Sequence, residues 1–93
     1  MKHYLLTYEV VEDYVEKRTP FRKIHLALAT AYFKEGQLIM GGALANPADK
    51  AMLVFRCEEV KTVEHFVQQD PYVLNGLVKS WEIREWTVVV GAE

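Results

Sequence analysis

The first apolar pattern in the chain is an alternation typical of a β-strand. Within His3–Val10, the residues that share one face are Tyr4, Leu6, Tyr8 and Val10. The opposite face carries Leu5 and Thr7, so it is not purely polar. Because both faces hold apolar groups, we expect this strand to lie in the centre of a sheet and to be covered on both sides.

A helical spacing of apolar residues comes next. The predicted helix runs from Phe21 to about Glu35, and its apolar stripe consists of Phe21, Ile24, Leu28 and Tyr32. Thr19 is suited to the N-cap position, and Pro20 fits the first turn, where a missing N–H has no intrahelical partner to lose. Gly36 is suited to end the helix.

The remaining pattern completes a β-α-β-β-α-β order. The expected elements are strands Gln37–Leu44 and Ala51–Cys57 joined by a turn at Ala45–Asp49, a helix at about Glu59–Gln69, a short helical turn within Tyr72–Val78, and a strand Trp81–Val90. Asp70 ends the second helix, because the residue before a proline is pushed out of the helical region. Right-handed crossovers then give an α+β, ferredoxin-like fold with a four-stranded antiparallel sheet and both helices on one face. We expect one domain, residues 1–93.

Apolar residues on the second face of this sheet predict an assembly. The alternating residues of the last strand are Trp86, Val88 and Val90 on one face and Ile83, Thr87 and Val89 on the other. Two helices cover only one face of a sheet, so the other face would expose apolar groups to water. We therefore expect that face to pack against a second copy of the chain in a symmetric homodimer.

The composition is that of a globular protein without a strongly charged surface. Hydrophobic residues are 51% and charged residues 26% of the chain, which excludes a disordered protein, and the formal net charge is −2. No run of Lys or Arg occurs, which argues against nucleic acid or an anionic membrane surface as a partner. No segment resembles an export signal or a membrane span, so we expect a cytoplasmic protein.

Three polar residues form the strongest candidate site. Arg22 and His25 lie three residues apart, so they are neighbours on the predicted helix, at the edge of its apolar stripe. Asp70 follows the second helix, where its carboxylate could orient the imidazole. Each residue alone has an ordinary structural role, but together they suit a general acid or base, with Arg22 holding an anionic group of the substrate. Tyr72, two residues after Asp70, is expected to contact the substrate.

Other catalytic arrangements are missing from the sequence. Ser80 and Cys57 are not placed as convincing nucleophiles, and Gly41-Gly42 is too short a signal for a phosphate-binding loop. The three histidines do not have the spacing of a zinc site, and the single cysteine cannot form an internal disulfide. We therefore expect no cofactor and no metal.

Several short motifs resemble the YciI-like (YCII-related) proteins over nearly the whole chain. They are Arg22-x-x-His25-Leu26, Glu35-Gly36-x-Leu38, Gly41-Gly42, Gln69-Asp70-Pro71-Tyr72, Gly76 and Trp86 in the terminal strand. The resemblance implies a dimeric ferredoxin-like α+β barrel with a pocket in which His25 and Asp70 pair as an acid–base dyad beside Arg22. A few relatives are linked to dehydrochlorination of aromatic ring compounds. The loop Ala45–Lys50 is compact beside the longer loop of some members, so no substrate class is transferred.

Two functional classes stay open, because this fold hosts unrelated functions. The first is a cofactor-independent enzyme that uses His25 and Asp70 for elimination or isomerisation of a small anionic or aromatic substrate. The alternative is a non-catalytic homodimer that binds a small-molecule ligand. A purely structural dimer would leave the His, Asp and Arg set without a role.

Overall fold

The computed structural model describes residues 1–91, and residues 92–93 of the predicted domain lie outside the described residues. The helices and strands are β1 (Lys2–Val10), α1 (Tyr14–Lys17), α2 (Thr19–Lys34), β2 (Leu38–Ala43), β3 (Lys50–Cys57), α3 (Val60–Gln69), α4 (Pro71–Leu74) and β4 (Val78–Trp86). The strands form one sheet in the order β2-β3-β1-β4, and every neighbouring pair is antiparallel. The predicted α+β, ferredoxin-like arrangement is confirmed.

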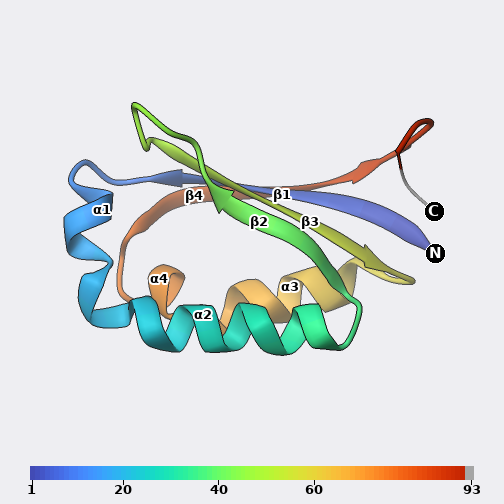
Figure 1. Cartoon of the computed structure of the whole chain (residues 1–93), viewed down its shortest axis with the longest axis horizontal. Coiled ribbons are helices and arrows are strands. Elements are labelled where there is room, and N and C mark those ends of the chain that lie inside the picture. The colour runs from blue at the N-terminus through green and yellow to red at the C-terminus, as the bar shows by residue number, and fades with distance from the viewer. Residues whose placement is uncertain (92–93) are drawn as a thin grey trace.

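The molecule has two layers, with the helices gathered on one face of the sheet (Figure 1). β1 lies between β3 and β4, so its predicted central place is confirmed. The other face of the sheet carries no helix within residues 1–91 (Figure 1). Within this part of the chain the helices cover one side of β1, and the covering of its other side by a second copy stays a prediction.

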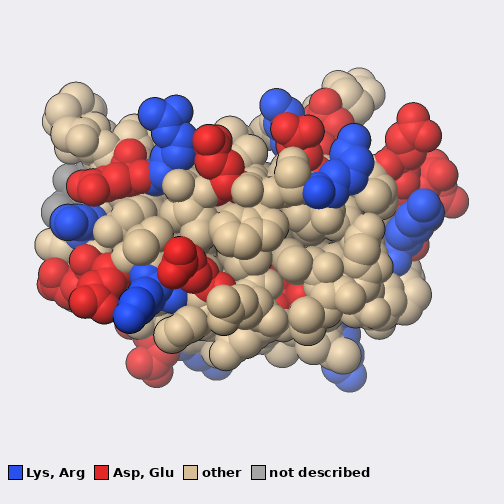
Figure 2. All heavy atoms as spheres, turned by 180° about the vertical axis from the view of Figure 1, so that it is seen from behind, with Lys and Arg blue, Asp and Glu red and all other residues tan. Residues whose placement is uncertain are grey.

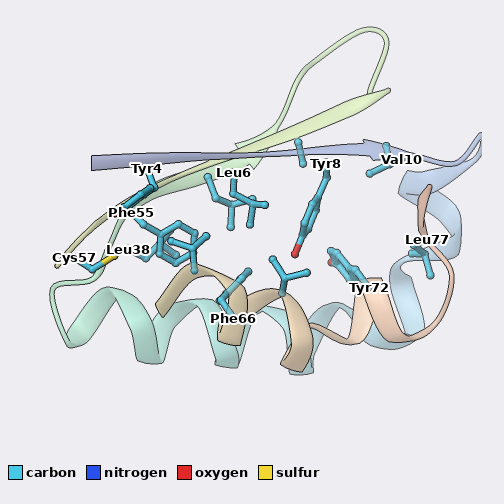
Figure 3. Close-up of a cluster of buried hydrophobic side chains, with 14 of the residues drawn as sticks. Tyr4, Leu6, Tyr8, Val10, Leu38, Phe55, Cys57, Phe66, Tyr72 and Leu77 are labelled. Atoms are coloured by element: carbon cyan, nitrogen blue, oxygen red, sulfur yellow. The ribbon is translucent and has the colours of Figure 1, made fainter. Parts of the chain in front are cut away.

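The core lies between the sheet and the helices (Figure 3). Alternate strand residues point to the same face, and those of β1 and β3 that face the helices are Tyr4, Leu6, Tyr8, Val10, Ala51, Leu53, Phe55 and Cys57. From the helix layer, α3 contributes Val63, Phe66 and Val67, which are all fully buried. The predicted inward face of the first strand is confirmed.

The first long helix, α2, differs from the prediction in its start and its buried stripe. Thr19, predicted as the N-cap, is the first helical residue, because Arg18 already has helical backbone angles of φ −74° and ψ −16°. Ile24 was placed in the stripe but is 63% exposed. Phe21, Leu28 and Tyr32 do pack against the core, and His25 occupies the place between them. The imidazole therefore lies on the side of the helix that faces the core.

The other end of α2 follows the prediction. Gly36 adopts a left-handed φ of +79°, which suits glycine because it has no Cβ. The N–H of Gly36 donates to the carbonyl of Phe33, and the N–H of Gln37 donates to the carbonyl of Tyr32, both at 3.0 Å. This pair of bonds is the Schellman motif, and it turns the chain from α2 into β2.

The last strand lies earlier in the chain than predicted. It was expected at Trp81–Val90, but β4 spans Val78–Trp86. The reason is its partner: Trp86 already lies opposite His3, close to the start of β1, so the next residues have no strand beside them. Val89 and Val90 are 86% and 85% exposed and do not extend an apolar sheet face, which corrects part of the argument for a dimer.

The uncovered sheet face still carries an apolar cluster, which we call the open-face patch. Its members are Leu5, Met40, Met52, Val54 and Trp86. The register places Leu5 opposite Val54, on the face away from the core residues. Met40 is 65% and Trp86 is 47% exposed. The apolar second face is therefore present, and its burial against a second copy stays a prediction.

Acidic and basic side chains are interspersed on the surface seen from behind in Figure 2. The basic side chains form no continuous area there, whereas a phosphate backbone requires a clustered basic surface. Within residues 1–91, none of the helices combines the length and the apolarity that a membrane crossing requires.

Candidate active site

A cavity of about 310 Å³ lies between α2 and the β2–β3 side of the sheet. The polar groups on its helix side are Tyr14, Arg18, Arg22, His25 and Tyr72. Tyr8 is the polar group on the sheet side, where the other lining residues include Leu38, Gly41, Ala51 and Leu53. The cavity therefore has a polar side and an apolar side, as small-molecule sites commonly do.

Asp70 lies at the junction of α3 and α4, where the local sequence turns its side chain inward. Its backbone has left the helical region, with φ −69° and ψ 117°, as expected for the residue before Pro71. The carboxylate then caps α4 by accepting the backbone N–H of Tyr72 at 3.0 Å. Asp70 is fully buried, at 0% exposure.

Three partners satisfy this buried carboxylate. The hydroxyl of Tyr8 donates to Oδ2 at 2.7 Å, and Nδ1 of His25 lies 2.8 Å from Oδ1, which also accepts the Tyr72 N–H. A carboxylate without such partners would lose several kcal/mol on leaving water. The contacts therefore explain how Asp70 is tolerated in the core, and they connect it to a histidine 45 residues away in sequence.

Aromatic rings fix the orientation of His25. Its ring stacks on Tyr72, with 3.8 Å between centroids and 8° between planes, and Phe66 approaches it edge-on at 6.5 Å. The His25 side chain is 14% exposed and lines the cavity. Among residues 1–91, no hydrogen bond reaches Nε2. With Nδ1 on Asp70, Nε2 is the ring nitrogen at which this arrangement can give or take a proton.

The predicted site residues come together around this cavity. His25 and Asp70 are in hydrogen-bond contact, and Tyr72 touches both, through its ring and its backbone N–H. Arg22 lines the same cavity. Its side chain is exposed, and within the described part of the chain it has no carboxylate within ion-pair distance.

Three further polar residues of the site are absent from the sequence prediction. Tyr8 holds Asp70, while Tyr14 and Arg18 line the cavity. Arg18 lies four residues before Arg22, a spacing that places both on one helix face. The sequence prediction missed this spacing because the predicted helix began after Thr19 and so did not include Arg18. The Tyr8 hydroxyl, by contrast, could be placed only once the sheet and α4 were in position.

Burial controls the ionisation of the tyrosines in the site. Burial, and then the adjacent Asp70 charge and hydrogen bond, raise the pKa of Tyr8 far above its ordinary value. Burial also raises the pKa of Tyr14 and the pKa of Tyr72. The nearby Arg18 partly offsets the rise for Tyr14. These phenols are therefore neutral hydrogen-bonding groups at physiological pH. Within residues 1–91, no three His, Cys, Asp or Glu side chains are close enough to hold a metal ion.

Solved structures with little sequence identity share this fold. With a TM-score of 0.78 and 18% identity, the chain is similar to 5-chloro-2-hydroxyhydroquinone dehydrochlorinase (TftG) from Burkholderia phenoliruptrix AC1100, in complex with 2,5-dihydroxybenzoquinone, over 91% of this chain and 93% of that one. It is similar to protein Atu4242 from Agrobacterium tumefaciens, with a TM-score of 0.62, 11% identity, and 97% and 95% coverage. An uncharacterized NIPSNAP domain protein from Burkholderia xenovorans gives a TM-score of 0.61 at 11% identity, with 100% and 99% coverage.

Sequence comparison decides the family. No protein with a curated description is similar enough to this chain to count as a match. The YCII-related domain, in contrast, matches residues 1–87, which is nearly the whole chain and includes every residue of the candidate site. The resemblance seen in the short motifs is thereby confirmed. The chain belongs to the YCII-related domain family.

Proposed function

We propose that this chain is a small enzyme that performs acid–base chemistry, an elimination or an isomerisation, on a small aromatic or anionic substrate. The observation that carries the proposal is the 2.8 Å contact between Nδ1 of His25 and the fully buried Asp70, beside a cavity. A carboxylate that accepts the Nδ1 proton fixes the imidazole tautomer and leaves the Nε2 lone pair for the substrate. Asp70 is then the orienting group and His25 the general acid and base, and the scheme uses no cofactor.

Loss of HCl from a chlorinated trihydroxybenzene is one reaction that such a histidine could carry out. His25 would move a proton from a ring hydroxyl to the chlorine-bearing carbon, which gives a ketone. It would then take the proton of a second hydroxyl while the C–Cl bond breaks and chloride leaves with the bonding electrons. The products are a hydroxyquinone, chloride and a proton. Oxidation of the ring is balanced by loss of chloride, so no external oxidant is required.

Family membership and fold likeness support this choice of reaction. TftG, with the same fold at 18% identity, is a dehydrochlorinase of a chlorinated hydroxyhydroquinone. Tyr8, Tyr14 and Tyr72 are among the residues that line the cavity of this chain, so hydroxyl and ring atoms lie together at the place where an aromatic substrate would bind. That substrate is therefore the first one to test.

The test is chloride release from 5-chloro-2-hydroxyhydroquinone, measured together with quinone absorbance. We expect turnover by the wild type and a loss of about 10²–10⁴-fold in His25→Ala, the range that a general acid or base contributes. His65→Ala is the matched control, because His65 is exposed on α3 and does not line the cavity. Turnover that survives in His25→Ala would contradict the proposal.

The alternative function is a non-catalytic module that binds a small ring compound in the same cavity. It predicts that 2,5-dihydroxybenzoquinone, the ligand of TftG, binds to the wild type while no chlorinated analogue is turned over. Calorimetric titration with that quinone, run beside the chloride assay, separates the two functions.

A homodimer is part of the proposal. The open-face patch supports it, because apolar groups of three strands and the exposed Trp86 lie together on a sheet face without a helix. A second copy of the chain is the partner that fits such a face by symmetry.

A further inference from the structure

The cavity is cationic although the chain as a whole is acidic. Arg18 and Arg22 line it, and no Asp or Glu does, whereas the formal net charge of the chain is −2. Asp70 does not reach the lining, since it is fully buried and held by its three partners. Two cations that face a cavity without an opposing carboxylate favour an anionic ligand.

Arg18 is placed by the junction between α1 and α2. It follows the last residue of α1 and precedes Thr19, with backbone angles that continue the helical direction. Arg18, Arg22 and Leu26 are each four residues apart, and all three line the cavity, as one face of a helix would. Both arginines therefore start from the same side of the cavity.

The Nε atom of Arg18 is buried and has no hydrogen-bond partner among the described residues. Buried donors in folded proteins nearly always have a partner, so an unpaired one requires an explanation. Arg18 also lines the cavity, so an acceptor bound there would pair this donor if the side chain turned toward it. A carboxylate is a suitable acceptor, since a guanidinium can give it two parallel N–H bonds.

A row of aromatic rings connects this arginine to the histidine. The guanidinium carbon of Arg18 lies 5.2 Å from the centroid of the Tyr14 ring. Tyr14 meets Tyr72 edge-on at 5.7 Å, and Tyr72 stacks on His25 at 3.8 Å. Along this wall, Arg18 and His25 are therefore separated by two stacked or edge-on rings, so a ligand held at the arginine would extend toward the imidazole.

We propose that Arg18, together with Arg22, binds the anionic oxygens of a flat single-ring ligand and so directs its ring toward His25. The ligand class is an aromatic carboxylate or phenolate, with its charge on the arginine side and its ring carbons against Leu38, Ala51 and Leu53. The proposal rests on the proposed function only for the identity of the cavity as the substrate site. Arg22 was expected from the sequence to hold an anion, and Arg18 is the added residue.

The experiment compares benzoate with benzamide, which has nearly the same shape but no charge. Affinities are measured by NMR titration of the full chain, and the side-chain Nε–H signal of Arg18 is followed at the same time. We expect the wild type to prefer benzoate by about tenfold or more, and benzoate to move the Arg18 signal. Arg18→Met, which keeps an unbranched apolar side chain, should lose the preference, and Arg18→Lys should keep part of it.

The matched control is Lys23→Met, which removes one positive charge from α2 at a residue that does not line the cavity. It should leave the preference for benzoate unchanged, and circular dichroism should show that each variant is folded. Equal affinity of the wild type for the two probes, including no binding of either at millimolar concentration, would overturn the proposal. So would a preference that survives in Arg18→Met.

These outcomes are separate from a failure of the proposed function. If the wild type prefers benzoate but releases no chloride from any chlorinated hydroxyquinol, the proposed enzymatic function is contradicted and the proposed anion site is retained. A wild type that turns over its substrate, with a benzoate preference unaffected by Arg18→Met, would overturn the anion site alone.

Discussion

The Tyr8 hydroxyl is the partner that the structure gives to Oδ2 of Asp70. In Figure 3 the Tyr8 ring extends from β1 toward the helices, with its oxygen on the side away from the sheet. Tyr8→Phe removes that donor and leaves a buried carboxylate oxygen unpaired. We expect the free energy of unfolding to fall by about 1.5–3 kcal/mol, the range for a hydrogen bond to a charged group. Urea denaturation followed by fluorescence measures it.

Tyr4→Phe is the control for this change. Tyr4 lies on the same face of β1 and is also buried, but it makes no hydrogen bond to Asp70. The free energy of unfolding should fall clearly less in Tyr4→Phe than in Tyr8→Phe. Equal losses in the two variants would show that the Tyr8 bond contributes nothing beyond packing.

The raised pKa of Tyr8 also predicts how stability depends on pH. The unfolded chain releases the phenol proton near pH 10, whereas burial and the Asp70 charge make the folded chain retain it. Unfolding therefore releases a proton above about pH 10, so the stability present below that pH is lost as pH rises. The loss of stability between about pH 10 and pH 12 should be steeper in wild type than in Tyr8→Phe. A pH series of denaturation curves for both proteins checks this, and parallel series would contradict it.

At the level of single residues, the sequence was sufficient to predict a contact where the ends of the helices bring the two residues together. His25 near the start of one helix and Asp70 at the end of another meet because both helices lie on one side of the sheet. Tyr8 and Arg18 could not be found in this way. The role of Tyr8 depends on how close its side chain on β1 comes to the start of α4, which is a tertiary distance. The role of Arg18 depends on the junction between α1 and α2, which helix propensity alone does not reveal.

At the scale of elements, the end of α2 makes a sharp prediction. Gly36 has a φ of +79°, and a Cβ added there would meet nothing within 4 Å. Gly36→Ala therefore tests backbone strain without a steric clash, and we expect it to destabilise the fold by about 1 kcal/mol. Thermal unfolding by circular dichroism is the measurement.

Gly42→Ala is the matched control, because its Cβ also enters open space but its φ is not in the left-handed region. It should be neutral or slightly stabilising. If both alanine variants lose the same stability, the left-handed conformation of Gly36 is not the cause.

The ends of helices and strands could be predicted where the backbone preference of a single residue sets them, but not where a tertiary partner sets them. Gly36 and Pro71 end their helices through their own backbone preferences. The end of β4 is set instead by the length of β1, since strand pairing stops where the partner stops. Val89 and Val90 have strong strand propensity, and only the tertiary partner decides that they lie outside the sheet.

At the scale of the whole molecule, the open-face patch predicts the oligomeric state. We expect light scattering at micromolar concentration to give twice the 10.8 kDa mass of one chain. Met40→Glu places a charge in the patch and should shift the protein to monomers, because an unpaired charge is costly to bury. Met40 is already 65% exposed in the single chain, so the variant should still fold.

Ile24→Glu is the control for that experiment. Ile24 is 63% exposed, nearly the same as Met40, but it lies on α2, in the helix layer on the opposite side of the sheet. This variant should remain a dimer. A wild type that is monomeric at these concentrations, or an Ile24→Glu monomer beside a Met40→Glu dimer, would contradict the assignment of the interface to the open face.

Asp70 ends one helix, caps the next, and holds Tyr8 and His25, so its place in the fold is not separable from its place in the site. This has a consequence for evolution. If the proposed reaction were lost in a lineage, selection for folding alone would still retain the carboxylate, whereas the imidazole could be replaced. Among distant relatives, an aspartate at this position would therefore indicate only that the fold has been inherited. Replacement of the histidine beside it would indicate that the function has changed.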